Sequence, residues 1–384
     1  MELETIKFIK EHSNWKDLLT TSPYRLFIVE DEYYYLLKYN MEESDFTNSI
    51  VKECRGLIID KLTLNPIALS FKKFHNIQEP IHDEIDWASA KVQEKIDGSK
   101  ILCFFNKYTN KWQLSTSGNL NAYEANVNDF GITFGSLFER ALINNSLNKN
   151  DFELLLHENY CYTFELVSPE SKIVVSYPQP DLYFIGMRNI NTFEEVSPNG
   201  YHYLHTIKKP KEYNLKTLDE CLTATSKMDC NQEGFVVVDK DWNRIKIKSP
   251  AYVYAHFLRQ NDGISFKNIL RLIDQNQQDD CLAIFPEYKP YFDEVLNKKI
   301  KYITNLKNAF NNFLNNFSNE NNHLYTRKDY AIYIINNYKN ISNFLFDCIN
   351  ANCFEINFSI DDFIPNWWKS IEDNKKVDIL KSID

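Results

Sequence analysis

The chain of 384 residues is long enough for two domains, each with a hydrophobic core of ordinary size. Hydrophobic residues make up 43% of it and aromatic residues 15%, which excludes a disordered or fibrous protein. The net charge of −10 is unusual for a protein that binds nucleic acid, but phosphate groups are bound by local basic patches, so the charge alone does not exclude that class.

The eight cysteines are scattered without a CxxC pair, and several stand in apolar, strand-like runs. A zinc site or a disulfide framework needs closer and more regular spacing, so we expect reduced and mostly buried thiols. No apolar run approaches the ~20 residues that span a bilayer, and the charged start MELETIKFIKEHSNW lacks a signal-peptide core. These features predict a cytoplasmic protein that does not associate with membranes.

Short strands dominate the first 250 residues. After a helical pattern at the N-terminus, runs rich in β-branched and aromatic residues occur at 33–39, 56–60, 66–71, 91–95, 100–105, 161–167, 182–187, 234–239 and 244–248. Another helical pattern lies around 216–228. Strands with interspersed helices and no regular βαβ rhythm predict an α+β fold with mostly antiparallel sheets.

Helical periodicity replaces the strand pattern after about residue 250, and residues 264–384 contain no glycine. Apolar residues recur there at steps of three and four, as Phe292, Leu296, Ile300, Ile303, Leu306, Phe310, Phe313 and Phe317, and then as Ile334, Ile335, Tyr338, Ile341, Leu345 and Cys348. We therefore expect a first domain over 1–255 and an all-helical second domain over 256–384, whose aromatic stripes form its core.

A Lys-x-Asp-Gly turn follows the strand at 91–95, in the segment EKIDGSK. Activation of a nucleic-acid end by ATP needs an amine that attacks the α-phosphorus, and Lys95 is the candidate. Lysine, with a pKa of ~10.4, becomes a nucleophile when neighbouring cations in a partly desolvated pocket lower that pKa. Gly98 would allow a tight turn close to the nucleotide, and Asp97 could hold a metal or a water. Alone the pattern is weak, because Asp-Gly also marks ordinary β-turns.

Charged residues in the neighbouring strands strengthen the pattern. Arg55 offers a planar fork for phosphate or ribose, and Lys73 belongs to a nearby strand. Glu165 stands in an apolar strand and Glu233 enters one, where an unpaired carboxylate is costly, so a metal or ribose hydroxyls are the expected partners.

Lys246 and Lys248 share one face of a strand, since side chains alternate with period two. Two adjacent ammonium groups repel unless an anion lies between them, and a triphosphate suits them. Each charged residue alone is compatible with an ordinary surface position. Together they predict one nucleotide pocket formed by Arg55, Lys73, Lys95, Glu165, Glu233, Lys246 and Lys248.

In their order, the motifs ECRG, KFHN, KIDGS, FELVSP, EGFV and KIKS resemble those of the bacteriophage RNA ligase 1 family, within the covalent nucleotidyltransferases. The resemblance covers roughly residues 30–255. It implies Lys95 as the adenylated nucleophile, Glu165 at the adenosine ribose, Glu233 as an aid to metal and lysine positioning, and Tyr252 as a further catalytic residue. It implies contacts with ATP for Tyr39, Arg55, Lys73, Lys95, Glu165, Lys246 and Lys248.

The resemblance also implies a divalent metal, Mg²⁺ or Mn²⁺, and a metal-binding pair, Asp279 and Asp280. The chain departs from the family at two positions. Ser117 replaces a lysine in the strand after the Lys-x-Asp-Gly turn, and His75 stands where an aromatic residue is usual. The first departure removes one expected contact with a phosphate or an RNA end.

The activity that follows from the resemblance is ATP-dependent joining of an RNA 5′-phosphate to an RNA 3′-hydroxyl, through a lysyl-AMP and an adenylylated RNA. It implies tRNA repair, with nicked tRNA as the substrate and a polynucleotide kinase–phosphatase in the same pathway. Because the helical domain lacks the strand signals of an oligonucleotide-binding barrel and its stripes form its core, we expect it to contribute substrate choice. A DNA ligase or capping enzyme is the alternative within the class, but those enzymes place a β-barrel after the Lys-x-Lys strand. A non-catalytic sensor of RNA ends is the alternative from another class.

Overall fold

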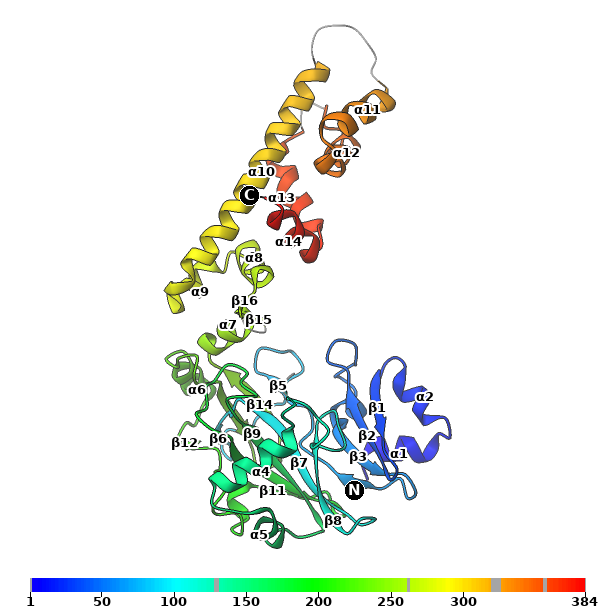
Figure 1. The fold of residues 1–384 in the computed structure, drawn as a ribbon, viewed down its shortest axis with the longest axis vertical. Coiled ribbons are helices and arrows are strands. Elements are labelled where there is room, and N and C mark those ends of the chain that lie inside the picture. Colours follow the sequence, from blue (N-terminus) through cyan, green and yellow to red (C-terminus); the bar gives the residue numbers. More distant parts are fainter. Residues whose placement is uncertain (1, 128–130, 261–262, 319–325, 355–357, 384) are drawn as a thin grey trace. The chain divides into compact units, whose positions relative to one another are not determined.

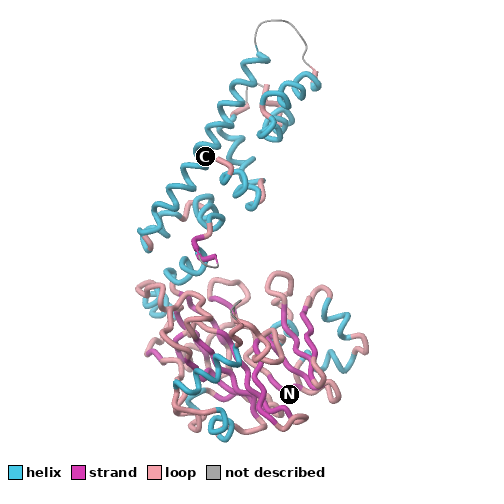
Figure 2. The backbone as a smooth tube through the Cα atoms, viewed as in Figure 1, coloured by secondary structure: helices cyan, strands magenta, loops and turns pink. Residues whose placement is uncertain are grey.

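The structure is a computed structural model, and it describes residues 2–127, 131–260, 263–318, 326–354 and 358–383 (Figure 1). The chain divides into two compact units, Met1–His256 and Phe257–Asp384. Figure 2 shows the strands concentrated in the first unit and the helices in the second. The expected α+β class, with antiparallel sheets followed by helices, is confirmed.

The first sheet of the N-terminal unit is antiparallel, in the order β1 (Leu26–Glu30), β2 (Tyr34–Tyr39), β3 (Arg55–Asp60) and β4 (Pro66–Ala68). Side chains along these strands point alternately to the two faces of the sheet, and both faces carry apolar side chains. One face packs on three short helices, α1 (Glu4–Glu11), α2 (Trp15–Thr20) and α3 (Ser49–Glu53), through residues such as Ile6, Leu19 and Val51. The other face packs on the central sheet through Leu36, Ile58, Leu102 and Phe104.

The central sheet has the order β11 (Glu195–Val196), β10 (Asp181–Asn189), β9 (Tyr160–Val167), β7 (Ser99–Asn106) and β8 (Lys111–Thr116), all antiparallel. Its outer face is covered by α4 (Phe134–Asn144) and α5 (Lys149–Leu154), whose Phe138 and Phe152 pack against Phe164. The central sheet therefore lies buried between the helices and the first sheet, which fixes the position of the residues that begin β7 and end β9.

The third sheet has the order β12 (Glu212–Tyr213), β6 (Lys91–Glu94), β13 (Gly234–Val238), β14 (Arg244–Lys248) and β5 (His75–Asn76). Its pairs are antiparallel except β14 with β5. Behind it lies α6 (Leu218–Thr225), and a core of Val92, Phe235, Val237, Ile245 and Ile247 fills the space beneath the sheet. The opposite face carries the charged residues of the motifs, and α7 (Pro250–Leu258) follows β14 directly.

The second unit is built from helices, apart from a hairpin of two-residue strands, β15 (Arg259–Gln260) and β16 (Gly263–Ile264). The helices are α8 (Phe266–Asp274), α9 (Gln278–Ile284), α10 (Lys289–Ser318), α11 (Arg327–Asn337), α12 (Ser342–Asn350), α13 (Ile360–Ser370) and α14 (Asp373–Lys381), with short 3₁₀ turns η2 (Pro286–Tyr288) and η3 (Lys339–Ile341). Leu306, Phe310 and Phe313 of α10 form a core with α11, α12 and α13.

Two details of the helical stripes differ from the expectation. Ile300 and Ile335 are 52% and 54% exposed, because each lies on the outer face of its helix. The second stripe does not run along one helix, since α11 ends before Tyr338 and α12 begins only at Ser342.

In the N-terminal unit, the run at 66–71 forms a strand only over Pro66–Ala68.

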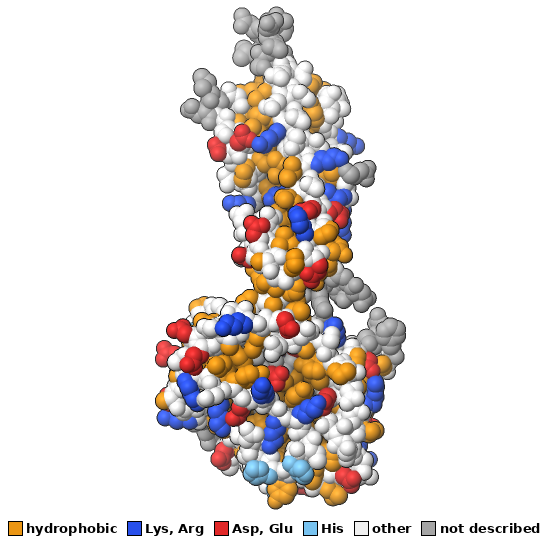
Figure 3. Space-filling view, turned by 90° about the vertical axis from the view of Figure 1, so that its left-hand side faces the viewer, with side chains coloured by type: hydrophobic (Ala, Val, Ile, Leu, Met, Phe, Trp, Pro, Cys, Tyr) orange, Lys and Arg blue, Asp and Glu red, His pale blue; other side chains and the backbone are white. Residues whose placement is uncertain are grey.

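All eight cysteines are free thiols, and all but Cys230 are buried. Within the residues that the structure describes, no helix combines the length and the apolar character needed to cross a membrane. On the face drawn in Figure 3, basic and acidic side chains are interspersed over both units.

Candidate active site

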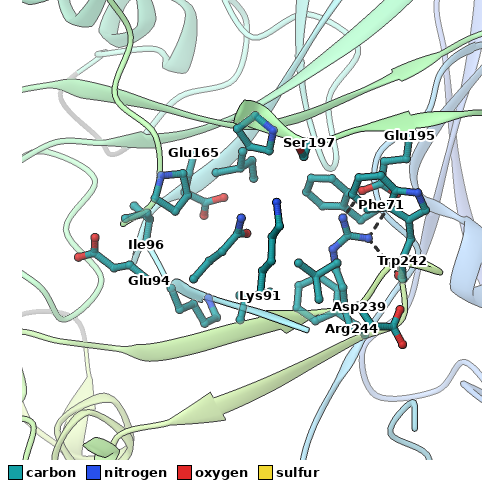
Figure 4. A pocket seen from close by; sticks show the side chains of 18 of the residues that line it. Phe71, Lys91, Glu94, Ile96, Glu165, Glu195, Ser197, Asp239, Trp242 and Arg244 are labelled. Atoms are coloured by element: carbon teal, nitrogen blue, oxygen red, sulfur yellow. Dashed lines mark hydrogen bonds and ion pairs between the residues drawn. The ribbon is translucent and has the colours of Figure 1, made fainter. Parts of the chain in front are cut away.

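A cavity of about 290 Å³ lies between the central sheet and the charged face of the third sheet (Figure 4). The strands β7, β9 and β10 contribute Lys100, Glu165 and Ile185 to one wall. The opposite wall comes from the third sheet and includes Lys91, Gln93, Lys95, Val236 and Arg244. The remaining lining includes Arg55, Phe71, Phe74 and Trp242.

Lys95 follows β6 at the mouth of this cavity, and its amide donates to the carbonyl of Gly234 on β13 at 2.9 Å. Its Nζ lies 2.8 Å from Glu233 Oε2. Lys248 Nζ lies 3.0 Å from the other oxygen, Oε1. Glu233 is buried, with 4% of its surface exposed, so one buried carboxylate holds two ammonium groups side by side. The expected proximity of Lys95, Glu233 and Lys248 is present in the structure.

Gly234 explains how this close approach is reached. Its φ of +131° is in the region that favours glycine, and a Cβ there would lie 2.1 Å from the carbonyl oxygen of Ile247. Any side chain at this position would push β13 away from β14. The glycine of the Glu-Gly motif is therefore required by the packing of the two strands that carry Glu233 and Lys248.

Both carboxylate oxygens of Asp97 accept hydrogen bonds from the protein, and the expected contact with a metal or a water stays a prediction. Tyr252 Oη donates to Oδ1 at 2.7 Å, and the amides of Val174 and Val175 donate to Oδ2 at 2.9 and 2.8 Å. The residue is 4% exposed. Asp97 thus fixes the turn after Lys95 to α7 and to the loop after β9.

The close approach that Gly98 permits is to β9. A Cβ on Gly98 would lie 2.6 Å from the carbonyl oxygen of Leu166 and 2.8 Å from Val167 Cγ1. This glycine therefore lets the Lys-x-Asp-Gly turn pack directly against the strand that carries Glu165.

Glu165 projects its carboxylate into the cavity (Figure 4) and has no ion-pair or hydrogen-bond partner among the described residues. Burial raises its pKa to about 7, against the opposing effect of the positive charges of Lys95 and Arg55. A carboxylate that is held near cations but left without a partner is suited to contact a metal ion or hydroxyl groups of a ligand.

Arg55, the first residue of β3, has a buried Nη1 atom without a hydrogen-bond partner. Its guanidinium lies 5.1 Å from the ring centroid of Phe74, and the Nζ of Lys246 lies 5.5 Å from the same ring. Burial, with the positive charges of Lys73, Lys95, Arg55 and Lys248, lowers the pKa of Lys246 to about 7. These cations repel one another, and Nη1 of Arg55 lacks an acceptor. Both features favour an anionic ligand.

Tyr39 and Lys73 contact each other beside this cluster. Lys73 Nζ lies 5.3 Å from the ring centroid of Tyr39 and 4.9 Å from that of Phe46. Burial, together with the charge of Arg55, lowers the pKa of Lys73. His75 is buried, its Nδ1 lies 2.7 Å from Glu79 Oε2, and its Nε2 has no hydrogen-bond partner.

Asp279 and Asp280 lie apart from these residues in sequence and in unit. They are exposed in the first turn of α9, in the helical unit. No group of three or more histidine, cysteine, aspartate or glutamate side chains that could hold a metal occurs in the described parts of the chain. The metal-binding role of this pair therefore stays a prediction.

Two features of the cavity were absent from the sequence prediction. Lys100 is buried in its wall, and a network of Arg188, Glu195 and Arg244 closes its far end. The guanidinium of Arg244 also lies 4.4 Å from the ring centroid of Phe71. Lys100 had a signal in the sequence, since it stands two and four residues before the apolar Leu102 and Phe104 on the same strand face.

The chain is similar in sequence to known RNA ligases. The model of a protein family described as RNA ligase matches residues 53–252, which include all the motifs of the cavity. A putative bifunctional polynucleotide kinase/RNA ligase of Autographa californica nuclear polyhedrosis virus is 32% identical over 281 residues, covering 67% of this chain and 39% of the viral protein. The chain thus spans about two fifths of that relative.

An RNA ligase of Rhodothermus phage RM378 is 24% identical over 345 residues, covering 71% of this chain and 74% of the phage protein. Among solved structures, an archaeal ATP-dependent RNA ligase aligns with a TM-score of 0.47 and 14% identity, over 79% of this chain and 82% of the archaeal one.

Proposed function

Because the chain belongs to the RNA ligase family whose model matches residues 53–252, we propose that it is an ATP-dependent RNA ligase that forms a lysyl-AMP at Lys95. The observation that carries the proposal is the position of Lys95 Nζ. It lies 2.8 Å from the buried carboxylate of Glu233, at a cavity large enough for a nucleoside.

In the first step, the Lys95 amine attacks the α-phosphorus of ATP, a P–N bond forms, and pyrophosphate leaves. Glu233 is the nearest acceptor for the proton that the amine loses. In the second step, an oxygen of an RNA 5′-phosphate attacks the AMP phosphorus and the lysine leaves. In the third step, an RNA 3′-hydroxyl attacks that 5′-phosphate, a phosphodiester forms, and AMP leaves.

The charges of the site support a triphosphate as the ligand. Lys246 and Lys248 lie on one face of β14, and the charges of Lys73, Lys95 and Arg55 act on Lys246. Positioning and charge neutralisation supply most of the catalysis in such in-line displacements. The excess of cations is local, since the chain as a whole carries −10.

The residues present also fit a divalent metal that arrives with ATP. Mg²⁺ is commonly held by one or two carboxylates, the substrate phosphates and water, and does not need an all-protein cage. Glu165 is a carboxylate of the cavity that lacks a protein partner in the described structure and would hold such an ion or the ribose hydroxyls. When bound, the metal would supply charge neutralisation at the phosphates. Mn²⁺ would serve in the same way.

RNA repair is the proposed role, with nicked tRNA as the substrate. The name of the viral relative couples a polynucleotide kinase with an RNA ligase, which supports a pathway in which a kinase–phosphatase prepares the ends that this chain joins. The helical unit, Phe257–Asp384, is the proposed substrate-selecting part.

Incubation with α-labelled ATP and a divalent metal, followed by a denaturing gel, tests the proposal. The parent chain should become labelled, Lys95→Ala should not, and Lys91→Ala, which removes a lysine of the same cavity wall, should still carry the label. Labelling of Lys95→Ala at the parent level would show that the nucleophile is another residue. ATP binding by the parent without label would instead favour the non-catalytic sensor.

A further inference from the structure

Lys100 is a buried lysine whose role the proposed reaction leaves open. It is the second residue of β7, is 9% exposed, and lines the cavity. Its Cα partner on β9 is Glu165, so the two side chains lie next to each other on the face of the sheet that borders the cavity.

The ammonium of Lys100 is held by a backbone group. Its Nζ donates a short hydrogen bond to the carbonyl oxygen of Arg55, and no carboxylate of the described residues lies within ion-pair distance of it. Burial, reinforced by the charge of Arg55, lowers the pKa of Lys100 well below its usual value. The charged groups that act on it are Arg55 and Glu165, with the Cys161 thiol close by.

The backbone that receives this hydrogen bond lies at a β-bulge. Lys38 pairs with Arg55 and Leu37 with Leu57, so Gly56 has no partner on β2 and has a φ of +81°. A bulge leaves the ladder locally open, and Arg55 stands at its edge. A Cβ on Gly56 would crowd Ser117, 3.2 Å from its Cα, but would be in ordinary contact with Lys100 Nζ at 3.7 Å, so the glycine serves the bulge itself.

An apolar residue would be the stable choice at position 100. Leu102 and Phe104 follow it on the same face of β7 and are fully buried, and a methionine would continue their row. Removing an ammonium from water for a single carbonyl acceptor is unfavourable. The lysine thus joins the central sheet to the first sheet at Arg55, a residue that lines the cavity and whose buried Nη1 has no hydrogen-bond partner.

We propose that Lys100 is a positioning residue for Arg55, which it fixes at the bulge so that the guanidinium is placed in the cavity wall, where a phosphoryl oxygen of ATP contacts it. This inference rests on the proposed function for its substrate. Lys100 holds the backbone carbonyl of Arg55, and the ring of Phe74 lies 5.1 Å from its guanidinium, so the two residues contact the backbone and the side chain of Arg55 respectively.

A pair of double-mutant cycles on the full-length chain tests the inference, with the single-turnover rate of lysyl-AMP formation as the readout. Lys100→Met should slow the reaction about tenfold or more, corresponding to ~1.4 kcal/mol. In an Arg55→Ala background the same change should slow it less than twofold, because its target is already gone. In a Lys248→Ala background, where the altered cation is held by Glu233, the full tenfold effect should remain.

Two further measurements separate positioning from folding. Lys100→Gln keeps a donor for the Arg55 carbonyl and should recover part of the rate lost in Lys100→Met, while the melting temperature of Lys100→Met should equal or exceed that of the parent. The inference would be overturned if Lys100→Met slowed lysyl-AMP formation equally in the Arg55→Ala and Lys248→Ala backgrounds, or if it did not slow the parent chain. The inference would also be overturned if Lys100→Gln formed lysyl-AMP as slowly as Lys100→Met.

The outcome is also distinguishable from failure of the proposed function. If the parent forms no lysyl-AMP, that function fails. The same double-mutant cycle is then carried out with the dissociation constant of ATP, measured by equilibrium dialysis, in place of the reaction rate. Coupling between Lys100 and Arg55 in ATP binding supports the positioning role in that case, and independent effects on the dissociation constant refute it.

Discussion

Tyr252 Oη lies 2.7 Å from Asp97 Oδ1, a hydrogen bond between residues 155 positions apart in the sequence. It ties α7, which follows the strand of Lys246 and Lys248, to the turn that follows Lys95. Burial, and the nearby carboxylates Glu233 and Asp97, raise the pKa of Tyr252, so the hydroxyl stays protonated and remains a donor. The relationship explains how a tyrosine outside the cavity lining can act on the nucleophile.

Tyr252→Phe should therefore slow lysyl-AMP formation several-fold and lower the free energy of unfolding by about 1–3 kcal/mol, because Asp97 Oδ1 loses a buried donor. Stopped reactions with α-labelled ATP give the rate, and urea unfolding gives the stability. Tyr203→Phe, at a residue 68% exposed, is the matched control and should change neither. A Tyr252→Phe chain with the parent rate would mean that Asp97 does not need this contact to place Lys95.

Lys246→Ala and Lys248→Ala should each lose most sealing, with lysyl-AMP formation the step most affected. The triphosphate of ATP carries more charge than the AMP already bound to the lysine, so the first step depends more on these cations. Supplying pre-adenylylated RNA bypasses that step and should restore sealing to a large extent.

Lys240→Ala is the control for this experiment, since Lys240 lines the far end of the same cavity and its Nζ lies 3.5 Å from Asp86. It should leave the lysyl-AMP step close to the parent rate. If sealing of pre-adenylylated RNA is as poor in the Lys246 and Lys248 variants as the overall reaction, the two lysines do not serve mainly in the first step.

The elevated pKa of Glu165 predicts a pH dependence of stability. Its pKa is about 7 in the folded chain against an ordinary 4.5, so the folded state binds the proton more tightly than the unfolded state. The stabilisation is complete below pH 4.5 and is lost as the pH rises through 7. Relative to Glu165→Gln, the parent should lose up to about 3 kcal/mol of unfolding free energy between pH 5 and pH 8.

Urea unfolding of both chains at pH 5, 6.5 and 8 measures this difference. Glu165→Gln should also fail to seal RNA, so that the variant is more stable than the parent at pH 8 but inactive. Parallel stability curves for the two chains would show that Glu165 has an ordinary pKa and that its burial is not unfavourable.

The sequence predicted those parts of the site that depend on local pattern. Period-two alternation placed Lys246 and Lys248 on one face of β14, and the apolar surroundings of Glu165 indicated a carboxylate with a special environment. Strand-rich segments were recognised because β-branched residues and turn signals reinforce each other. The strand β1 and the helix α5 were missed because their patterns are only five and six residues long, whereas α4 was missed although its eleven residues begin with a capping box at Thr133.

What the sequence could not reveal were contacts between distant segments. The role of Asp97 follows from Tyr252 and from the backbone amides of Val174 and Val175, and no local pattern announces those partners. Gly98 was expected to approach a nucleotide, whereas its missing side chain makes room for β9. The acceptor of Lys100, the carbonyl of Arg55, belongs to another sheet.

The lysines Lys298 and Lys299 of α10, adjacent in the sequence, show that in the helical unit, too, a local pattern does not reveal contacts between distant segments. Lys298 Nζ donates to the carbonyl of Ile383 at 2.6 Å. Lys299 Nζ lies 2.8 Å from the carboxylate of Asp274, and Lys376 Nζ lies 3.0 Å from the same carboxylate. Lys298 thus ties α10 to the segment after α14, and Lys299 ties it to the end of α8. A sequence reading that takes lysine clusters as RNA contacts cannot distinguish these structural ion pairs from a binding surface.

The last prediction concerns the helical unit as a whole. Deleting residues from about 262 onward should spare lysyl-AMP formation, because the cavity, Lys95 and Tyr252 all belong to the unit Met1–His256. It should erase any preference for a nicked tRNA stem-loop over a plain single strand, since a rigid helical surface can read the shape and backbone of folded RNA. Competition between the two RNAs in sealing reactions measures the preference of each chain.

Two controls make this deletion informative. The shortened chain must be soluble and monomeric, because newly exposed apolar surface would cause association that alters RNA binding. The double variant Asp279→Ala, Asp280→Ala of the full-length chain removes the predicted metal pair, exposed in the first turn of α9, without removing any helix. It should keep the preference for tRNA if that pair acts only through a metal. A folded, monomeric deletion that retains the full preference would place substrate choice in the N-terminal unit instead.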